Sequence, residues 1–137
     1  MSRAKKIYLG GAITHAGDEQ ILQWYQNITD TLERIGYEVF LPHRDVHLPK
    51  HKDEQDIHNI NMKAVKQANL VIAYVGIPSL GVGMVLQAAQ DKNIPTILLA
   101  EDNSTLSEMI LYTNNIQTTI HFHDKEDAIA KLIAHIS

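Results

Sequence analysis

Residues 70–83 read LVIAYVGIPSLGVG, and the fold class follows from this segment. Its first part, 70–75, is a near-continuous apolar run, which is typical of a strand covered on both faces. A loop containing glycine and proline follows over 76–83, and a helix is predicted from there to about Lys92. A buried strand that leads directly into a helix indicates βα units and a parallel sheet.

The same alternation extends to both sides of this segment. Short apolar runs predict four more strands, at 6–9, 37–41, 95–100 and 117–122. Apolar residues at helical spacing predict further helices over 21–35, 57–68 and 106–112 and after Asp124. The chain of 137 residues has the length of one ordinary domain. We therefore expect a single domain, 1–137, of the α/β class: a doubly wound five-stranded parallel sheet in the order 2-1-3-4-5, with helices on both faces.

The helix predicted over 21–35 carries one large residue beside its apolar stripe. The stripe includes Ile21, Tyr25, Ile28 and Leu32, and it predicts the buried face of the helix. Trp24 falls off this stripe. Two interpretations stay open for it: an interface residue, and a half-covered residue of the surface.

Two glycine-rich loops, 10–15 and 78–83, follow the first and third strands. Sheets of this class bind ligands at the carboxyl ends of these strands, where the strand order reverses. The second loop enters a helix, whose first N–H groups and dipole favour an anion, and Ser79 adds a hydroxyl donor. Two interpretations stay open: a phosphate site, and a strand-to-helix turn that simply requires glycine.

Composition argues against several functional classes. Twelve Lys and Arg against 16 Asp and Glu give a net charge of −4, which does not suit a protein that binds a nucleic-acid backbone. The sequence has no cysteine, so disulfides, thiolate zinc sites and iron–sulfur clusters are excluded. No run approaches the length of a membrane span or a signal-peptide core. We expect a cytoplasmic protein with no nucleic-acid or membrane partner.

Four of the eight histidines cluster around one polar segment: His43, His47, His51 and His58. Neutral imidazole is a common metal ligand, so a metal site is one interpretation. Pro49 interrupts the helical spacing of the first three, and the segment matches no zinc signature. We therefore predict a loop over 43–54 near the ligand end of the sheet, with no metal and no cofactor.

In three segments, 78–83, 7–13 and 106–110, the sequence resembles the nucleoside 2-deoxyribosyltransferase superfamily, closest to its 2′-deoxynucleoside 5′-monophosphate N-glycosidases. Residues 78–83, PSLGVG, resemble the signature loop, and residues 7–13, IYLGGAI, resemble the first strand and its glycine-rich loop. Residues 106–110, LSEMI, resemble a late helix that reaches the site of a neighbouring subunit. The resemblance implies a carboxylate nucleophile that attacks the anomeric carbon of the sugar, and a homodimer or higher homo-oligomer.

The resemblance also implies a set of site residues. Ser79, with the backbone of Gly81 and Gly83, would hold the 5′-phosphate of a nucleoside monophosphate, and Ser107 would come from a partner chain. The implied ligand-binding residues are Tyr8, Gly11, Ile13, Asn61, Ser79, Gly81, Gly83, Ser107 and Met109.

Two positions depart from the family pattern. Val85 stands where the family has its nucleophilic glutamate, and Asn61 where it has an aspartate on the preceding helix. Valine cannot attack carbon, and an amide loses the acid–base function of a carboxylate.

Three hypotheses follow: a nucleotide-binding protein without the glutamate reaction, an active N-glycosidase or deoxyribosyltransferase with a relocated acid, and an interaction module without a ligand. The retained phosphate-side residues favour the first. Candidates for a relocated acid are Asp45, Asp53, Glu54, Asp56, Glu101, Asp102 and Glu108.

Overall fold

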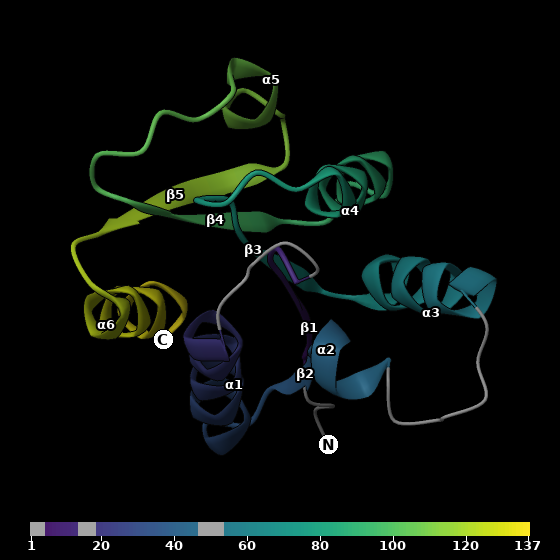
Figure 1. Ribbon diagram of the computed structural model, residues 1–137, viewed down its shortest axis with the longest axis horizontal. Helices are drawn as coiled ribbons and strands as arrows, with labels where there is room; N and C mark the ends of the chain where they lie inside the picture. Colours follow the sequence, from purple (N-terminus) through teal and green to yellow (C-terminus); the bar gives the residue numbers. More distant parts are fainter. Residues whose placement is uncertain (1–4, 14–18, 47–53) are drawn as a thin grey trace.

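The apolar runs form one parallel sheet, and the computed structural model describes it through residues 5–13, 19–46 and 54–137. The strands are β1 (Lys6–Gly10), β2 (Glu38–Phe40), β3 (Leu70–Tyr74), β4 (Thr96–Glu101) and β5 (Ile116–Phe122). Their order is β2-β1-β3-β4-β5, and every neighbouring pair is parallel (Figure 1). The predicted fold class and strand order are therefore confirmed.

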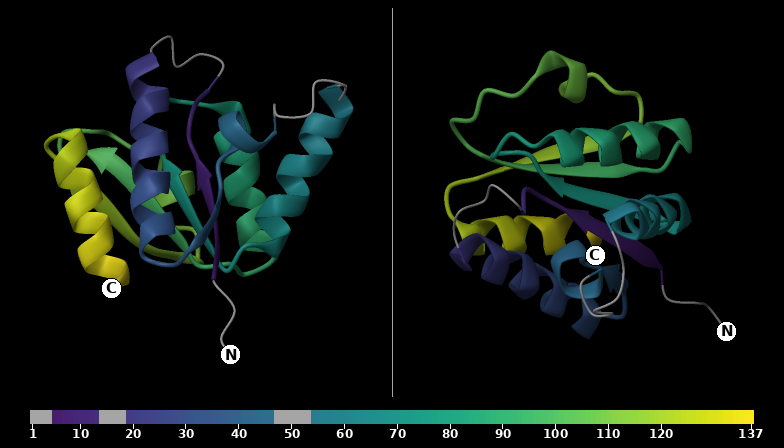
Figure 2. Two further views of the ribbon diagram at one scale, coloured as in Figure 1. Left: turned by 90° about the horizontal axis from the view of Figure 1, so that it is seen from below. Right: turned by 45° about the vertical axis from the view of Figure 1, so that its right-hand side comes forward.

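Helices cover both faces of the sheet. They are α1 (Glu19–Arg34), α2 (Pro42–Asp45), α3 (Glu54–Gln67), α4 (Leu80–Asp91), α5 (Glu108–Leu111) and α6 (Lys125–Ile136). Helices α1 and α6 lie on one face, and α3 and α4 lie on the other (Figure 2). Ile110 and Leu111 of α5 pack on the α4 side, against a cluster that contains Val82 and Leu98. In the described part of the chain, no helix has the length and apolar character needed to cross a bilayer.

Alternation along the strands sorts their side chains between the two faces. Ile7 and Leu9 of β1 pack in the core beneath α1 and α6, whereas Tyr8 packs with residues of α3 and α4. On β3, Tyr74 joins the α1–α6 core and Val71 joins the opposite one. The polar ends of Tyr8 and Tyr74 therefore lie on opposite faces of the sheet.

The loop predicted over 43–54 is partly wrong. Pro42–Asp45 forms the short helix α2, with proline in the first turn, where a missing N–H costs no helical hydrogen bond. Helix α3 begins at Glu54. His47 and His51 lie outside the described residues.

Both interpretations of Trp24 are wrong, because the indole is a core residue that is 2% exposed. Its ring packs edge-on against Tyr74, with centroids 5.0 Å apart and an interplanar angle of 89°. Its Nε1 donates to the carbonyl of Lys125 at 3.1 Å. Helix α1 meets both the sheet and α6, so its buried surface is wider than a single apolar stripe.

Arg44 ties α2 to the edge of the sheet. Its Nη2 donates to the carbonyl of Val39 on the edge strand β2 at 2.8 Å. The same guanidinium pairs with Asp45 at 2.8 Å and with Glu33 of α1 at 3.1 Å. Asp45 also accepts the backbone N–H of Leu41 at 2.8 Å. These bonds fix the position of α2 beside the carboxyl end of β2.

Candidate ligand site

A cavity of about 380 Å³ opens at the carboxyl end of the sheet, where the loops after β1 and β3 meet α3. Seven of the positions that the family resemblance assigns to the site line it: Tyr8, Gly11, Ile13, Asn61, Ser79, Gly81 and Val85. Three other predicted ligand residues are not among its described lining residues: Gly83, Ser107 and Met109. The cavity lies at the strand-order reversal, where this fold class places ligands.

Tyr8 and Asn61 form the polar part of the cavity wall. Tyr8 stacks on Phe40, with ring centroids 5.6 Å apart, and its hydroxyl donates to Oδ1 of Asn61 at 2.9 Å. Nδ2 of Asn61 donates to the carbonyl of Ile57 at 3.0 Å. Burial raises the pKa of Tyr8 above its usual range, so the phenol, neutral at pH 7 in any tyrosine, stays neutral to higher pH. A carboxamide satisfies both neighbours, whereas a carboxylate has no hydrogen for Ile57.

Ser79 forms the N-cap of α4 at the opposite side of the cavity. Its Oγ accepts the backbone N–H of Val82 at 3.3 Å. This bond uses an oxygen lone pair, so the hydroxyl hydrogen remains able to donate to a ligand. The first N–H groups of a helix have no partner within the helix, and the positive end of the α4 dipole lies here. This part of the wall therefore suits an anionic group.

Val85 belongs to the apolar part of the wall. It is 6% exposed and packs with Tyr8, Val65 and Ala89 in one cluster between β1, α3 and α4. The side chain lines the cavity but offers no proton, charge or lone pair.

The cavity wall is poor in ionisable groups. Among its described lining residues, none is Asp or Glu, and His58 and Tyr8 are the side chains with a titratable proton. The described residues also contain no group of three His, Asp or Glu side chains placed to hold a metal ion. The wall can therefore bind through neutral donors, a helix dipole and apolar contacts.

A model of the nucleoside 2-deoxyribosyltransferase family matches residues 7–130. The chain belongs to this family. A Methanosarcina mazei protein named "Putative 2'-deoxynucleoside 5'-phosphate N-hydrolase 1" is 30% identical over 133 residues, which cover 94% of this chain and 81% of that protein. A Methanosarcina barkeri protein of the same name is 34% identical over 113 residues, covering 80% of this chain and 70% of that protein.

Solved structures support the same fold. The CMP N-glycosidase of Clostridium botulinum superposes with a TM-score of 0.77 at 20% identity, covering 96% of this chain and 99% of that one. The 2-deoxyribosyltransferase of Bacillus psychrosaccharolyticus gives a TM-score of 0.69 at 22% identity, covering 89% and 88%. The fold predicted from the family resemblance is therefore confirmed.

The described carboxylates that could replace the family acids lie outside the cavity wall. Glu101 extends from β4 onto the α1–α6 face, where its Oε2 accepts the Tyr74 hydroxyl at 2.6 Å. Asp45 is engaged by Arg44 and Leu41. The remaining described candidates, Asp56, Asp102 and Glu108, are exposed. None of these five lines the cavity. Asp53 and the side chain of Glu54 lie outside the described residues.

The glycine at position 11 is required by packing. A Cβ built there would overlap the ring and hydroxyl of Tyr25, which donates to the carbonyl of Ala12 at 3.0 Å. The loop after β1 therefore passes directly over Tyr25 before it reaches the cavity. The rest of this predicted loop, from residue 14, lies outside the described part.

Four lining residues were not singled out from the sequence: Pro42, Val46, Met62 and Met84. His58, which the sequence placed in a histidine cluster near the ligand end, also lines the cavity. Met62 could have been found, because it follows His58 by four residues and therefore lies on the same face of α3. Pro42 and Val46, at the two ends of α2, carry no such signal, because their segment reads as a loop.

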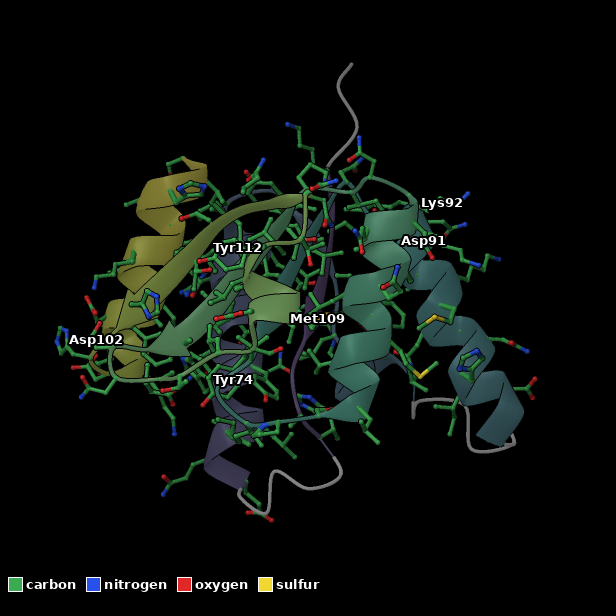
Figure 3. The ribbon with its side chains drawn as sticks, turned by 90° about the horizontal axis from the view of Figure 1, so that it is seen from above. Tyr74, Asp91, Lys92, Asp102, Met109 and Tyr112 are labelled. Carbon is green, nitrogen blue, oxygen red and sulfur yellow. The ribbon has the colours of Figure 1, made fainter. Side chains whose placement is uncertain are left out.

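The late helix lies at the surface. The Oγ of Ser107 caps α5 by accepting the N–H of Met109 at 3.2 Å. Met109 is 86% exposed and Tyr112 is 80% exposed (Figure 3). Leu80, in the first turn of α4, is 92% exposed. In the single chain, the surface around α4 and α5 therefore exposes large apolar side chains to solvent.

Proposed function

We propose that this chain binds a nucleoside or nucleoside 5′-monophosphate and lacks the glutamate-nucleophile reaction that the family resemblance implies. The observation that carries the proposal is the cavity wall itself. Val85 and Asn61 both line it, and none of its described lining residues is a carboxylate. The described part of the wall therefore offers no carboxylate that could attack the anomeric carbon and form a covalent glycosyl intermediate.

The wall suggests how such a ligand would lie. The 5′-phosphate would sit at the N-terminus of α4, against Ser79 and the backbone of Gly81, where donors and dipole favour an anion. The sugar would face Val85 and the Tyr8–Asn61 pair. The base would contact the apolar side chains of α2 and α3, which recognise a ring by shape.

A second copy of the chain is the proposed partner. The exposed α4–α5 surface, with Leu80, Met109 and Tyr112, supports this because large exposed apolar groups mark association surfaces. In such a homodimer, Ser107 and Met109 would reach the neighbouring cavity.

Thermal unfolding with the four 2′-deoxynucleoside 5′-monophosphates, combined with chromatography of free base, tests the proposal. A ligand at a hundredfold excess over Kd stabilises the folded state by about 2.7 kcal/mol. We expect such stabilisation without base release. Base release at an enzyme-like rate would favour the second candidate, an active N-hydrolase with an acid from elsewhere, which the names of the relatives at 30% and 34% identity support. No stabilisation by any nucleotide would refute nucleotide binding.

Restoring the acids gives a sharper test. The double variant Val85→Glu/Asn61→Asp is expected to release base, whereas its matched control Val85→Gln/Asn61→Asp is not, because glutamine has the same shape without a nucleophilic charge. Ser79→Ala is expected to weaken monophosphate binding and leave binding of the unphosphorylated nucleoside unchanged. An inert but folded acid-restored variant would show that the cavity differs from an active one in more than its two acids.

A further inference from the structure

Three side chains form a polar cluster on the sheet face opposite the cavity. The Tyr74 hydroxyl donates to Oε2 of Glu101 at 2.6 Å, and the rings of Tyr25 and Tyr74 lie 6.4 Å apart. The two tyrosines are 2% and 3% exposed. Burial, with the negative charge of Glu101, raises the pKa of both above the usual range. Both hydroxyls are hydrogen-bond donors at neutral pH, as in any tyrosine, and the raised pKa keeps them so to higher pH.

Two glycines allow the ligand-side loops to lie directly on this cluster. A Cβ on Gly11 would overlap Tyr25, and a Cβ on Gly76 would overlap the Tyr74 hydroxyl and the Glu101 carboxylate. Gly11 belongs to the cavity wall, and Gly76 lies in the loop that joins β3 to Ser79. The cluster therefore contacts both loops from the side that faces away from the cavity.

We propose that Tyr25 and the Tyr74–Glu101 pair are positioning residues that fix the spacing of Gly11 and Ser79 across the bound ligand. The identity of the ligand rests on the proposed function. None of the three side chains lines the cavity, so they act through the loops. Tyr25 holds the first loop by its bond to the Ala12 carbonyl. The Tyr74–Glu101 bond holds the second, and bonds to carboxylates are about twice as strong as neutral ones.

The test removes single hydroxyls while keeping the rings. Tyr25→Phe and Tyr74→Phe are each expected to weaken binding of the 2′-deoxynucleoside 5′-monophosphates on the order of tenfold, measured by calorimetry well below the unfolding temperature. Tyr37→Phe is the matched control. This variant also loses a hydrogen bond from a tyrosine hydroxyl to a backbone carbonyl, that of Ile136 at 3.4 Å, but Tyr37 does not line the cavity. The variant should therefore bind the monophosphates with the affinity of the unaltered chain. Emission of Trp24, which packs on Tyr74, verifies that the core is intact.

Glu101 offers a rescue comparison. Glu101→Gln keeps an acceptor for the Tyr74 hydroxyl and is expected to retain most of the affinity, whereas Glu101→Ala should lose as much as Tyr74→Phe. If Glu101 had a merely structural role, its variants would unfold more easily, but the affinity for the monophosphate would not be higher in Glu101→Gln than in Glu101→Ala and Tyr74→Phe.

Amide hydrogen exchange of the ligand-free protein tests the support independently of any nucleotide. Exchange should be faster over 10–13 in Tyr25→Phe and over 75–79 in Tyr74→Phe. Unchanged affinity or unchanged exchange in both tyrosine variants would overturn the positioning role. If the unaltered chain binds no nucleotide, the proposed function fails, and exchange alone decides whether the cluster fixes the loops.

Discussion

Removing the Asn61 side chain tests whether its bond to Tyr8 organises the cavity wall. In Asn61→Ala, the Tyr8 hydroxyl loses its acceptor at 2.9 Å and the Ile57 carbonyl loses its donor at 3.0 Å. An unsatisfied buried polar group costs about 1–3 kcal/mol. Because Tyr8 lines a cavity that water can enter, we expect the lower part of this range, about 1–2 kcal/mol. For a chain of this length the unfolding temperature should fall by roughly 3–6 °C.

A double-mutant cycle isolates the bond itself. Tyr8→Phe removes only the donor and should cost about 1 kcal/mol, since water can satisfy the Asn61 oxygen. In Tyr8→Phe/Asn61→Ala neither partner remains, so the cost should be less than the sum of the single costs by about 1 kcal/mol. Urea unfolding, followed by fluorescence of the chain's one tryptophan, Trp24, measures each variant. A coupling energy below about 0.3 kcal/mol would show that the two side chains do not interact.

Three further predictions concern stability. Burial raises the pKa of three tyrosines, Tyr8, Tyr25 and Tyr74. The free energy of unfolding that these neutral tyrosines contribute should therefore be complete below the unfolded-state pKa of about 10. Above that pH it should be lost, by about 1.4 kcal/mol per pH unit for each tyrosine. Urea unfolding at a series of pH values, with tyrosinate absorbance as the readout of ionisation, measures this loss, and a stability that does not change with pH contradicts it. Gly76→Ala should cost about 1–3 kcal/mol, because its methyl group would overlap Tyr74 and Glu101. Gly83→Ala, whose Cβ would meet nothing within 4 Å, should stabilise α4 by about 0.5–1 kcal/mol. Thermal unfolding compares the two glycine variants, and shifts of the same sign would contradict this distinction.

The fold could be predicted from the sequence because its three central strands, β1, β3 and β4, are buried and apolar on both faces. The run 70–75 predicts β3, and the alternation around it predicts the strand order. The buried position of Trp24 could not be predicted from the sequence, because helical periodicity describes one packing surface whereas α1 packs against both the sheet and α6. Helix α2 was missed because a four-residue helix leaves no periodic pattern and is held by Arg44 rather than by an apolar stripe.

Part of the cavity wall could also be predicted from local sequence patterns. The glycine-rich loops and the family resemblance point to residues such as Tyr8, Asn61 and Ser79, which the structure brings to one wall. The Tyr74–Glu101 contact could not be predicted from the sequence, because it depends on the register of two strands and joins residues 27 positions apart. Local sequence patterns carry no information about such a pairing.

The Arg44 contact at β2 has a consequence for self-association. β2 is a sheet edge of three residues, and free edge carbonyls are where strands of other molecules add to form aggregates. The carbonyl of Val39 is already bound by a positively charged guanidinium, itself held by Glu33 and Asp45. An incoming strand would have to displace this ion-paired group before it could pair with the edge. Arg44 thus hinders intermolecular β-pairing at the β2 edge of the sheet, and this effect does not depend on a ligand in the cavity.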